Sequence, residues 1–267
     1  MTDRVAITID AGVAQVELAR PDKLNALDKR MFDGLIAAGE QLSKDKSVRC
    51  VVLSGQGRAF CAGLDLQNFM MLAGETDLKK LLLDRHPGSP ANYGQQAAYT
   101  WSALPVPVIA ALHGHVYGGG LQLALGADIR IAAADAELSV LEIKWGLIPD
   151  MGGNQPLVNL VSLDVAKELT FTGRKLSGRE AAELGLVTRL ADDPKAAALE
   201  TARTIAGKSP HAIRAAKQVL DKCVEVDRAA VLELESQLQL PLIGSPNQLE
   251  AVQANFQKRE PRFSDPD

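Results

Sequence analysis

The stretch that decides the fold reads PVIAALHGHVYGGG over residues 107–120 and continues LQLALGAD over residues 121–128. Its apolar first part predicts a buried strand over residues 108–112, and a helix is expected to begin at Gly119 and Gly120. The start of a helix leaves backbone N–H groups without partners at the positive end of the helix dipole. Because glycine lets other atoms approach the backbone closely, the stretch indicates either a tightly packed strand–turn–helix or a main-chain site for a negatively charged oxygen.

The spacing of these glycines excludes several familiar sites. The G-x-G-x-x-G pattern of a dinucleotide site is absent after the strand, and so is the G-K-[ST] of a phosphate-binding loop. The chain also lacks the G-x-S-x-G of a serine hydrolase. The glycines therefore indicate neither a nucleotide phosphate site nor a serine nucleophile.

A second stretch, AFCAGLDL at residues 59–66, has the same order of strand, glycine loop and helix, with the helix expected near Asp65. Two such units can aim two backbone N–H groups at one point. Between the two units, the charged, proline-bearing residues 74–90 are expected to form a surface insertion or lid that lines a substrate tunnel.

Strands and helices alternate over residues 1–193, which is typical of an α/β fold. The expected strands are residues 4–10, 13–19, 48–54, 108–112, 129–132, 137–140 and 186–190. The expected helices are residues 28–44 with Asp28 as N-cap, 91–103, a helix from 154, 162–171 and 177–184. From residue 194 to residue 267 the pattern is helical, over 194–207, 210–223, 227–240 and 246–258. This tail cannot bury its apolar faces alone, so we expect it to pack on the α/β core or on another subunit.

Composition narrows the class of protein. The chain has 267 residues, 46% of them hydrophobic, and a net charge of −4, which argues against broad binding to nucleic acid or to a membrane surface. The three cysteines lie far apart, which predicts neither a disulfide framework nor a zinc site and favours a cytoplasmic location. The histidines show no metal-ligand pattern, and His113 and His115 are expected to be structural. No apolar stretch reads as a signal peptide or a membrane span.

Six segments carry a resemblance in the same order along the chain: RPDKLNAL (20–27), AFCAGLDL (59–66), HGHVYGGGLQLALGADIRIA (113–132), EIKWGLIPDMGG (142–153), FTGRKLSGREAAELGLV (171–187) and FQKREPRF (256–263). Together they resemble the crotonase superfamily, also called the enoyl-CoA hydratase/isomerase family. The resemblance implies a spiral of ββα units with a C-terminal helical segment, and a homotrimer or a hexamer made of two trimers. It also implies an acyl-CoA thioester as substrate, with no metal or redox cofactor.

The resemblance assigns site residues by motif. The N–H groups of Leu64 and Gly119 would bind the thioester oxygen. Glu142 matches a catalytic glutamate of family hydratases, whereas Gln122 stands where those hydratases carry their other glutamate. Because glutamine has no useful proton chemistry, two-carboxylate hydration is in doubt and Gln122 is expected to line the site.

Asp150 supports a different chemistry. The spacing from Glu142 to Asp150 is similar to the acid pair of the dienoyl-CoA isomerase branch, although that branch carries an aspartate at the place of Gln122. A dehalogenase branch has its nucleophilic aspartate at the place of Asp150 but a tryptophan at the place of Glu142. We therefore expect a double-bond shift in a 3-enoyl- or 3,5-dienoyl-CoA. The alternatives are a hydratase acting on a 2-enoyl-CoA and a non-catalytic acyl-CoA-binding protein.

Contacts with CoA are also implied by motif. Arg20 and Lys23 match a segment beside the CoA phosphates, and Lys258 matches a lysine that reaches CoA from a neighbouring subunit. The remaining expected contacts, beside the adenine, are Ala62, Asp65 and Leu66. For each basic residue, a solvated surface charge is the alternative.

Overall fold

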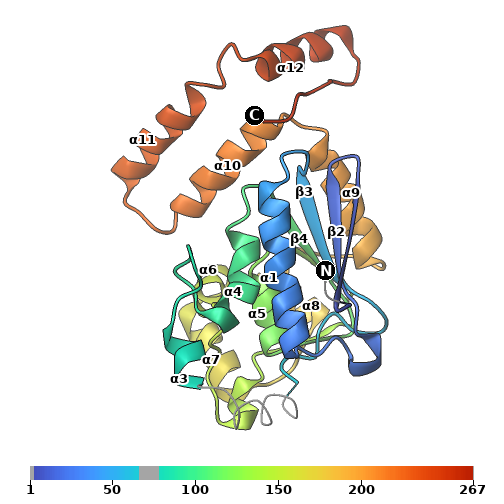
Figure 1. Cartoon of the computed structure of the whole chain (residues 1–267), viewed down its shortest axis with the longest axis vertical. Coiled ribbons are helices and arrows are strands. Elements are labelled where there is room, and N and C mark those ends of the chain that lie inside the picture. The colour runs from blue at the N-terminus through green and yellow to red at the C-terminus, as the bar shows by residue number, and fades with distance from the viewer. Residues whose placement is uncertain (1–2, 66–77, 267) are drawn as a thin grey trace.

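The computed structural model describes residues 3–65 and 78–266, and a six-stranded sheet forms its centre (Figure 1). The strand order is β1-β2-β3-β4-β6-β9, and only the pair β1–β2 is antiparallel. The strands are β1 (Val5–Asp10), β2 (Val13–Leu18), β3 (Cys50–Gly55), β4 (Val108–Leu112), β6 (Ile129–Ala132) and β9 (Arg189–Leu190). The predicted hairpin and the predicted central strands are confirmed.

Helices cover both faces of this sheet, which explains why its two central strands are buried over their whole length. All residues of β3 and β4 are buried. On one face lie α1 (Lys29–Lys44), which Asp28 caps as predicted, and α4 (Tyr93–Ser102). On the other face, α9 (Pro194–Ala206) places Ala198 and Ala202 against strand residues such as Val52 and Ile109.

A second, three-stranded sheet consists of β5 (His115–Tyr117), β7 (Glu137–Ser139) and β8 (Leu176–Ser177). The chain leaves β4, turns at Gly114, runs through β5 and enters α5 (Gly119–Leu125), which makes one ββα unit. Gly114 has φ +55°, and a Cβ atom there would lie 2.0 Å from the Arg58 carbonyl oxygen, so only glycine fits. The strand pair β6–β7, followed by the 3-10 helix η2 (Glu142–Trp145), repeats this course.

Two predictions of strands were wrong in part. Residues 59–65 form no strand, because Cys61 makes only an isolated bridge to Val116 of β5 and the chain then turns at Gly63. The last strand is limited to Arg189–Leu190 rather than residues 186–190. The helix start expected near Asp65 falls at the edge of the described residues, and residues 74–77 of the expected insertion lie outside them. Its described part contains α3 (Leu78–Leu83).

The remaining helices follow the predicted order. They are α6 (Asn154–Leu160), α7 (Leu163–Thr172), α8 (Gly178–Glu183), α10 (Pro210–Lys222), α11 (Arg228–Gln239) and α12 (Pro246–Gln257). Figure 1 shows α10–α12 standing away from the body of the molecule, whereas α9 lies along the sheet. The predicted division of the chain at residue 193 stays a prediction. Helix α9 follows that position and packs into the core of the six-stranded sheet that precedes it.

Two polar contacts tie the projecting helices to the core. The Lys217 ammonium group lies 2.7 Å from the Asp128 carboxylate and donates to the Val106 carbonyl oxygen. The Arg49 guanidinium group donates to two acceptors near the C-terminus, the Phe263 carbonyl oxygen and the Asp265 carboxylate. Over the described residues, no helix is both long and apolar enough to cross a membrane.

Candidate active site

The backbone N–H groups of Leu64 and Gly119 lie on neighbouring segments. The N–H of Leu27 donates to the Gly63 carbonyl oxygen, and the N–H of Asp65 donates to the Leu27 carbonyl oxygen, so the N–H of Leu64 points away from Leu27. A Cβ atom at Gly63 would lie 3.6 Å from the Gly119 nitrogen. Neither the Leu64 N–H nor the Gly119 N–H donates a hydrogen bond to any described residue.

Close packing around these N–H groups requires glycine. Gly63 has φ +88°, and a Cβ atom there would lie 2.6 Å from the Tyr117 carbonyl oxygen. At Gly119, a Cβ atom would lie 2.8 Å from the Met151 sulfur and 3.0 Å from a methyl carbon of Leu27. The glycines therefore serve close packing, and within the described part of the chain two main-chain donors on neighbouring segments are left without a partner.

The Glu142 carboxylate lies beside Gly118, the residue that precedes Gly119. A Cβ atom built on Gly118 would lie 3.4 Å from Oε1 of Glu142, which places the carboxylate one residue from Gly119. Oε1 accepts a hydrogen bond of 2.7 Å from Nε2 of Gln122, whereas Oε2 is buried and has no partner among the described residues. Burial raises the pKa of Glu142, and the nearby charge of Asp150 raises it further.

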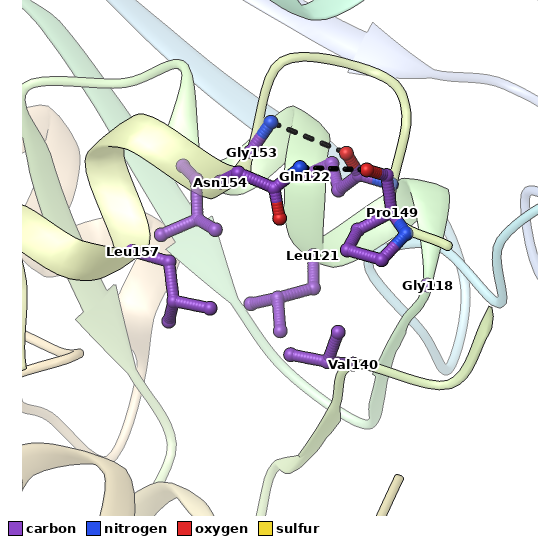
Figure 2. Close-up of a pocket in the computed structure, with 9 residues that line it drawn as sticks. Gly118, Leu121, Gln122, Val140, Pro149, Gly153, Asn154 and Leu157 are labelled. Atoms are coloured by element: carbon purple, nitrogen blue, oxygen red, sulfur yellow. Dashed lines mark hydrogen bonds between the residues drawn. The ribbon is translucent and has the colours of Figure 1, made fainter. Parts of the chain in front are cut away.

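Gln122 makes more contacts than the sequence indicates. Its side-chain oxygen accepts hydrogen bonds from the N–H groups of Met151 (2.8 Å) and Gly153 (3.2 Å), and the second bond is drawn in Figure 2. The residue is 4% exposed. Sequence reasoning missed the roles of Met151 and Gly153, because a main-chain donor has no residue signature. The only signal was a lone polar residue in the apolar helix α5.

Asp150 lies in the loop that follows η2. The residue is exposed in the single chain, yet the protein atoms around its carboxyl group raise its pKa through desolvation. The Asn154 amide donates to the Pro149 carbonyl oxygen at 2.7 Å and folds the loop back toward α6 (Figure 2). The structure thus brings the charges of Glu142 and Asp150 close enough to interact.

Two hollows adjoin the site. Figure 2 shows a small apolar one, enclosed by residues such as Leu121, Val140 and Leu157. A larger pocket of about 570 Å³ lies between the end of α4, the start of α6 and α10, and Gln122 and Met151 contribute to its wall.

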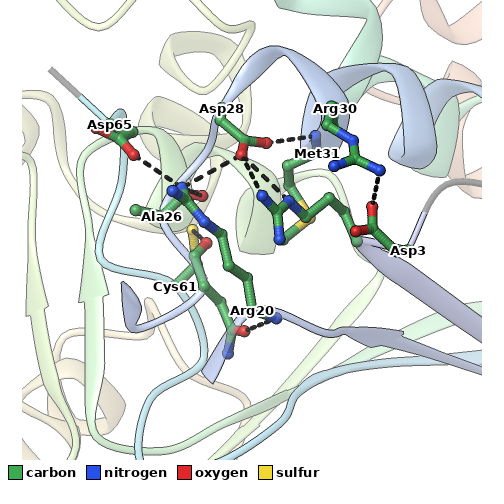
Figure 3. A network of polar contacts seen from close by, with 10 residues as sticks. Asp3, Arg20, Ala26, Asp28, Arg30, Met31, Cys61 and Asp65 are labelled. Atoms are coloured by element: carbon green, nitrogen blue, oxygen red, sulfur yellow. Dashed lines mark hydrogen bonds and ion pairs between the residues drawn. The ribbon is translucent and has the colours of Figure 1, made fainter. Parts of the chain in front are cut away.

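Arg20 has its charge satisfied inside the chain (Figure 3). Its guanidinium group lies 2.8 Å from the Asp65 carboxylate, 3.5 Å from the Asp28 carboxylate and 3.1 Å from the Ala26 carbonyl oxygen. The residue is 6% exposed. Because these contacts and its burial hold the guanidinium group inside the chain, we leave Arg20 out of the proposed site.

The other residues expected near CoA are dispersed. Lys23 is exposed at the end of the 3-10 helix η1 (Pro21–Lys23), and Lys258 is exposed just after α12. Ala62 is half-buried and donates its N–H to the Leu24 carbonyl oxygen. Leu66 lies outside the described residues. Lys258 therefore lies at the end of a projecting helix, whereas Lys23 and Ala62 share one loop region.

The expected structural histidines lie beside the small sheet. His113 Nε2 is 3.0 Å from the Gly57 carbonyl oxygen, and the His115 ring stacks on Tyr117 with centroids 4.9 Å apart. Over residues 3–65 and 78–266, no group of three or more His, Cys, Asp or Glu side chains is arranged to hold a metal ion.

Comparison with known proteins identifies relatives along nearly the whole chain. The family model described as enoyl-CoA hydratase/isomerase matches residues 8–266. The enoyl-CoA hydratase domain-containing protein 2, mitochondrial, of Bos taurus is 36% identical over 259 residues, which cover 94% of this chain and 84% of the relative. The methylglutaconyl-CoA hydratase, mitochondrial, of Mus musculus is 32% identical over 259 residues, which cover 94% of this chain and 79% of that protein.

A solved structure shows the same fold. The enoyl-CoA hydratase from Bacillus anthracis superposes with a TM-score of 0.87 and 34% identity, covering 97% of this chain and 98% of the other. The expected α/β fold with C-terminal helices is thereby confirmed.

Proposed function

The chain is an enzyme of the enoyl-CoA hydratase/isomerase (crotonase) family, and from that premise we propose that it shifts a double bond in an unsaturated acyl-CoA. The substrate would be a 3-enoyl-CoA or a 3,5-dienoyl-CoA. The observation that carries the proposal is the half-buried Glu142 carboxylate, which lies beside Gly118. Its Oε2 atom and the N–H of the neighbouring Gly119 have no partner among the described residues.

The two main-chain donors supply the electrostatic part of the mechanism. Removal of a proton from C2 of a thioester places negative charge on the thioester oxygen. The N–H groups of Leu64 and Gly119 would bind that oxygen, and because they are fixed by the surrounding backbone they need little reorganisation when charge develops. Loss of one such donor typically costs about 2.7–4 kcal/mol of barrier height.

The carboxylates supply the proton transfer. In a 3-enoyl-CoA, Glu142 takes the proton from C2, and the electron pair moves through the enolate so that C2=C3 forms and C3=C4 is lost. When Glu142 returns this proton to C4, it ends in its starting state. When a protonated Asp150 supplies the proton for C4 instead, the proton held by Glu142 must pass to Asp150 before the next turnover. Environments that raise the pKa of a carboxyl group suit it to exchange protons near neutral pH.

Hydration of a 2-enoyl-CoA is the second candidate. The observation in its favour is that relatives carry hydratase names, and Glu142 stands at the place of a hydratase glutamate. In this reaction Glu142 would activate water, with Asp150 or Gln122 in support.

Ultraviolet absorbance on a 2-enoyl-, a 3-enoyl- and a 3,5-dienoyl-CoA distinguishes the two candidates. The proposal expects conjugated absorbance to rise with the 3-enoyl or the 3,5-dienoyl substrate. Loss of conjugation from the 2-enoyl substrate alone would instead support hydration. Binding of all three without turnover would support the non-catalytic alternative.

The projecting helices support an oligomer. Large apolar side chains on α10–α12 and their connections are exposed in the single chain, among them Leu220, Leu232, Leu240, Leu249 and Phe256. We propose that these faces pack against other copies in a trimer or a pair of trimers, with Lys258 reaching a neighbour's CoA and Lys23 binding CoA within its own chain. Light scattering on purified protein tests this assembly, and a monomer at micromolar concentration would contradict it.

The proposed reaction needs no metal or redox cofactor. The cytoplasmic location stays a prediction, and several relatives are named as mitochondrial.

A further inference from the structure

The orientation of the Gln122 amide is fixed by its neighbours. Two backbone N–H groups, of Met151 and Gly153, donate to one end of the amide, so that end is the oxygen. The other end is therefore the NH₂ group, and it donates to Oε1 of Glu142. Glu142 consequently keeps Oε1 as an acceptor and has only Oε2 free for proton transfer.

The same side chain also holds the segment that carries Asp150. Met151 and Gly153 flank Gly152, which has φ +87°, and Asp150 directly precedes them. A Cβ atom at Gly153 would lie 2.7 Å from Cγ of Gln122, so the loop packs tightly on this side chain. One residue thus contacts both the carboxylate of Glu142 and the backbone beside Asp150.

We propose that Gln122 is a positioning residue. Its amide orients the Glu142 carboxylate and holds the loop that carries Asp150, so that proton transfer at this end of the site uses the one carboxylate of Glu142 in a fixed orientation. The proposal rests on the proposed function in one respect, namely that Glu142 is the residue that transfers the proton. At this length, glutamine offers an acceptor on one side and a donor on the other without carrying a titratable proton. Glutamate would place two carboxylate oxygens within hydrogen-bond distance, where they must share a proton. Leucine would leave two buried N–H groups unpaired.

Two variants separate the two contacts. Gln122→Leu removes both, whereas Gln122→Glu keeps an acceptor for the two N–H groups and replaces the amide donor to Glu142 by a second carboxyl group, whose charge raises the pKa of Glu142. Gln96→Leu is the matched control, because Gln96 is also buried, in α4, and its Oε1 has no partner among the described residues. The readouts are kcat and KM, the pH profile of kcat, and amide hydrogen exchange of a peptide covering residues 150–157.

For Gln122→Leu we expect kcat to fall roughly 100-fold with KM changed by less than about threefold. We also expect faster exchange in the 150–157 peptide. The pH at which kcat declines on the acid side should move upward, because the Gln122 N–H no longer favours the charged form of Glu142. Gln122→Glu should retain slow exchange yet show the same upward movement, and Gln96→Leu should change none of these readouts.

An unchanged acid side of the pH profile in both Gln122 variants, or unchanged exchange in Gln122→Leu, would overturn the inference. If Gln122→Leu does not fold, the pH profile of Gln122→Glu decides alone. The exchange readout requires no turnover. If the wild-type protein converts no acyl-CoA while the variants show the expected differences in exchange, the proposed function is contradicted and the positioning of the loop by Gln122 is still supported.

Discussion

Nε2 of Gln122 donates a hydrogen bond of 2.7 Å to Oε1 of Glu142 and leaves Oε2 of that carboxylate buried without a partner among the described residues. A glutamate held in this way has one oxygen free to take a proton. The bond therefore links Gln122, which departs from the hydratase pattern, to Glu142, which matches that pattern.

The stability of the fold should depend on the ionisation of Glu142. Burial raises its pKa above the usual range of a glutamate, so the folded state favours the protonated form. The favourable contribution is present below about pH 4.5 and is lost as the pH rises through the folded-state pKa. Glu142→Gln should therefore be more stable to urea than wild type at about pH 7, by a margin that narrows toward about pH 5. A margin that is constant with pH would show that Glu142 ionises normally.

Gly119→Ala should lose most activity. The new methyl group would lie 2.8 Å from the Met151 sulfur, which forces the start of α5 or the loop to shift and moves the Gly119 N–H. We expect kcat to fall about 10²–10³-fold, as for loss of one oxyanion donor. Gly94→Ala is the control, because its methyl group would meet only Oδ1 of Asn92, at 3.6 Å. Activity of Gly119→Ala close to wild type would remove Gly119 from the site.

Arg20 and Lys23 should differ in what they support. Arg20→Met removes the buried guanidinium group beside Asp28 and Asp65, although Asp28 keeps its contact with Arg4 at 3.1 Å, and the free energy of unfolding in urea should fall by about 3 kcal/mol. Lys23→Ala should change stability by no more than about 0.5 kcal/mol and raise KM for an acyl-CoA. A stable Arg20→Met variant with a raised KM would instead return Arg20 to the CoA site.

Long apolar runs made the core of the fold predictable. Residues 108–112 form β4 and Gly119 begins α5, because a continuous buried run and a following glycine pair are local signals. The short strands β5 and β8 were not predicted, since two or three residues carry no periodicity and their pairing partners lie far along the chain. Likewise, helical periodicity alone could not show that α9 packs on the sheet whereas α10–α12 project from the body.

The residues of the site were predictable only through motifs. The contacts between residues of different motifs were not predictable from the sequence. The structure sets Glu142 beside Gly118, and the charge of Asp150 raises the pKa of Glu142, while the catalytic roles of the two carboxylates stay a prediction. The burial of Arg20 depends on Asp65, which lies 45 residues further along the chain. The N–H groups that hold Gln122 come from a loop about 30 residues later. Such pairings depend on tertiary structure, which no local pattern of residue types records.

The most direct test of the account compares initial rates on a 3-enoyl-CoA, read as the rise in conjugated-enoyl absorbance, for wild type, Glu142→Gln and Glu183→Gln. Glu183 is an exposed carboxylate at the end of α8 and serves as the matched control. Removal of an acid–base group should slow Glu142→Gln by roughly 10²–10⁴-fold, while Glu183→Gln keeps the wild-type rate. Equal rates for wild type and Glu142→Gln would contradict the central claim that Glu142 moves the proton.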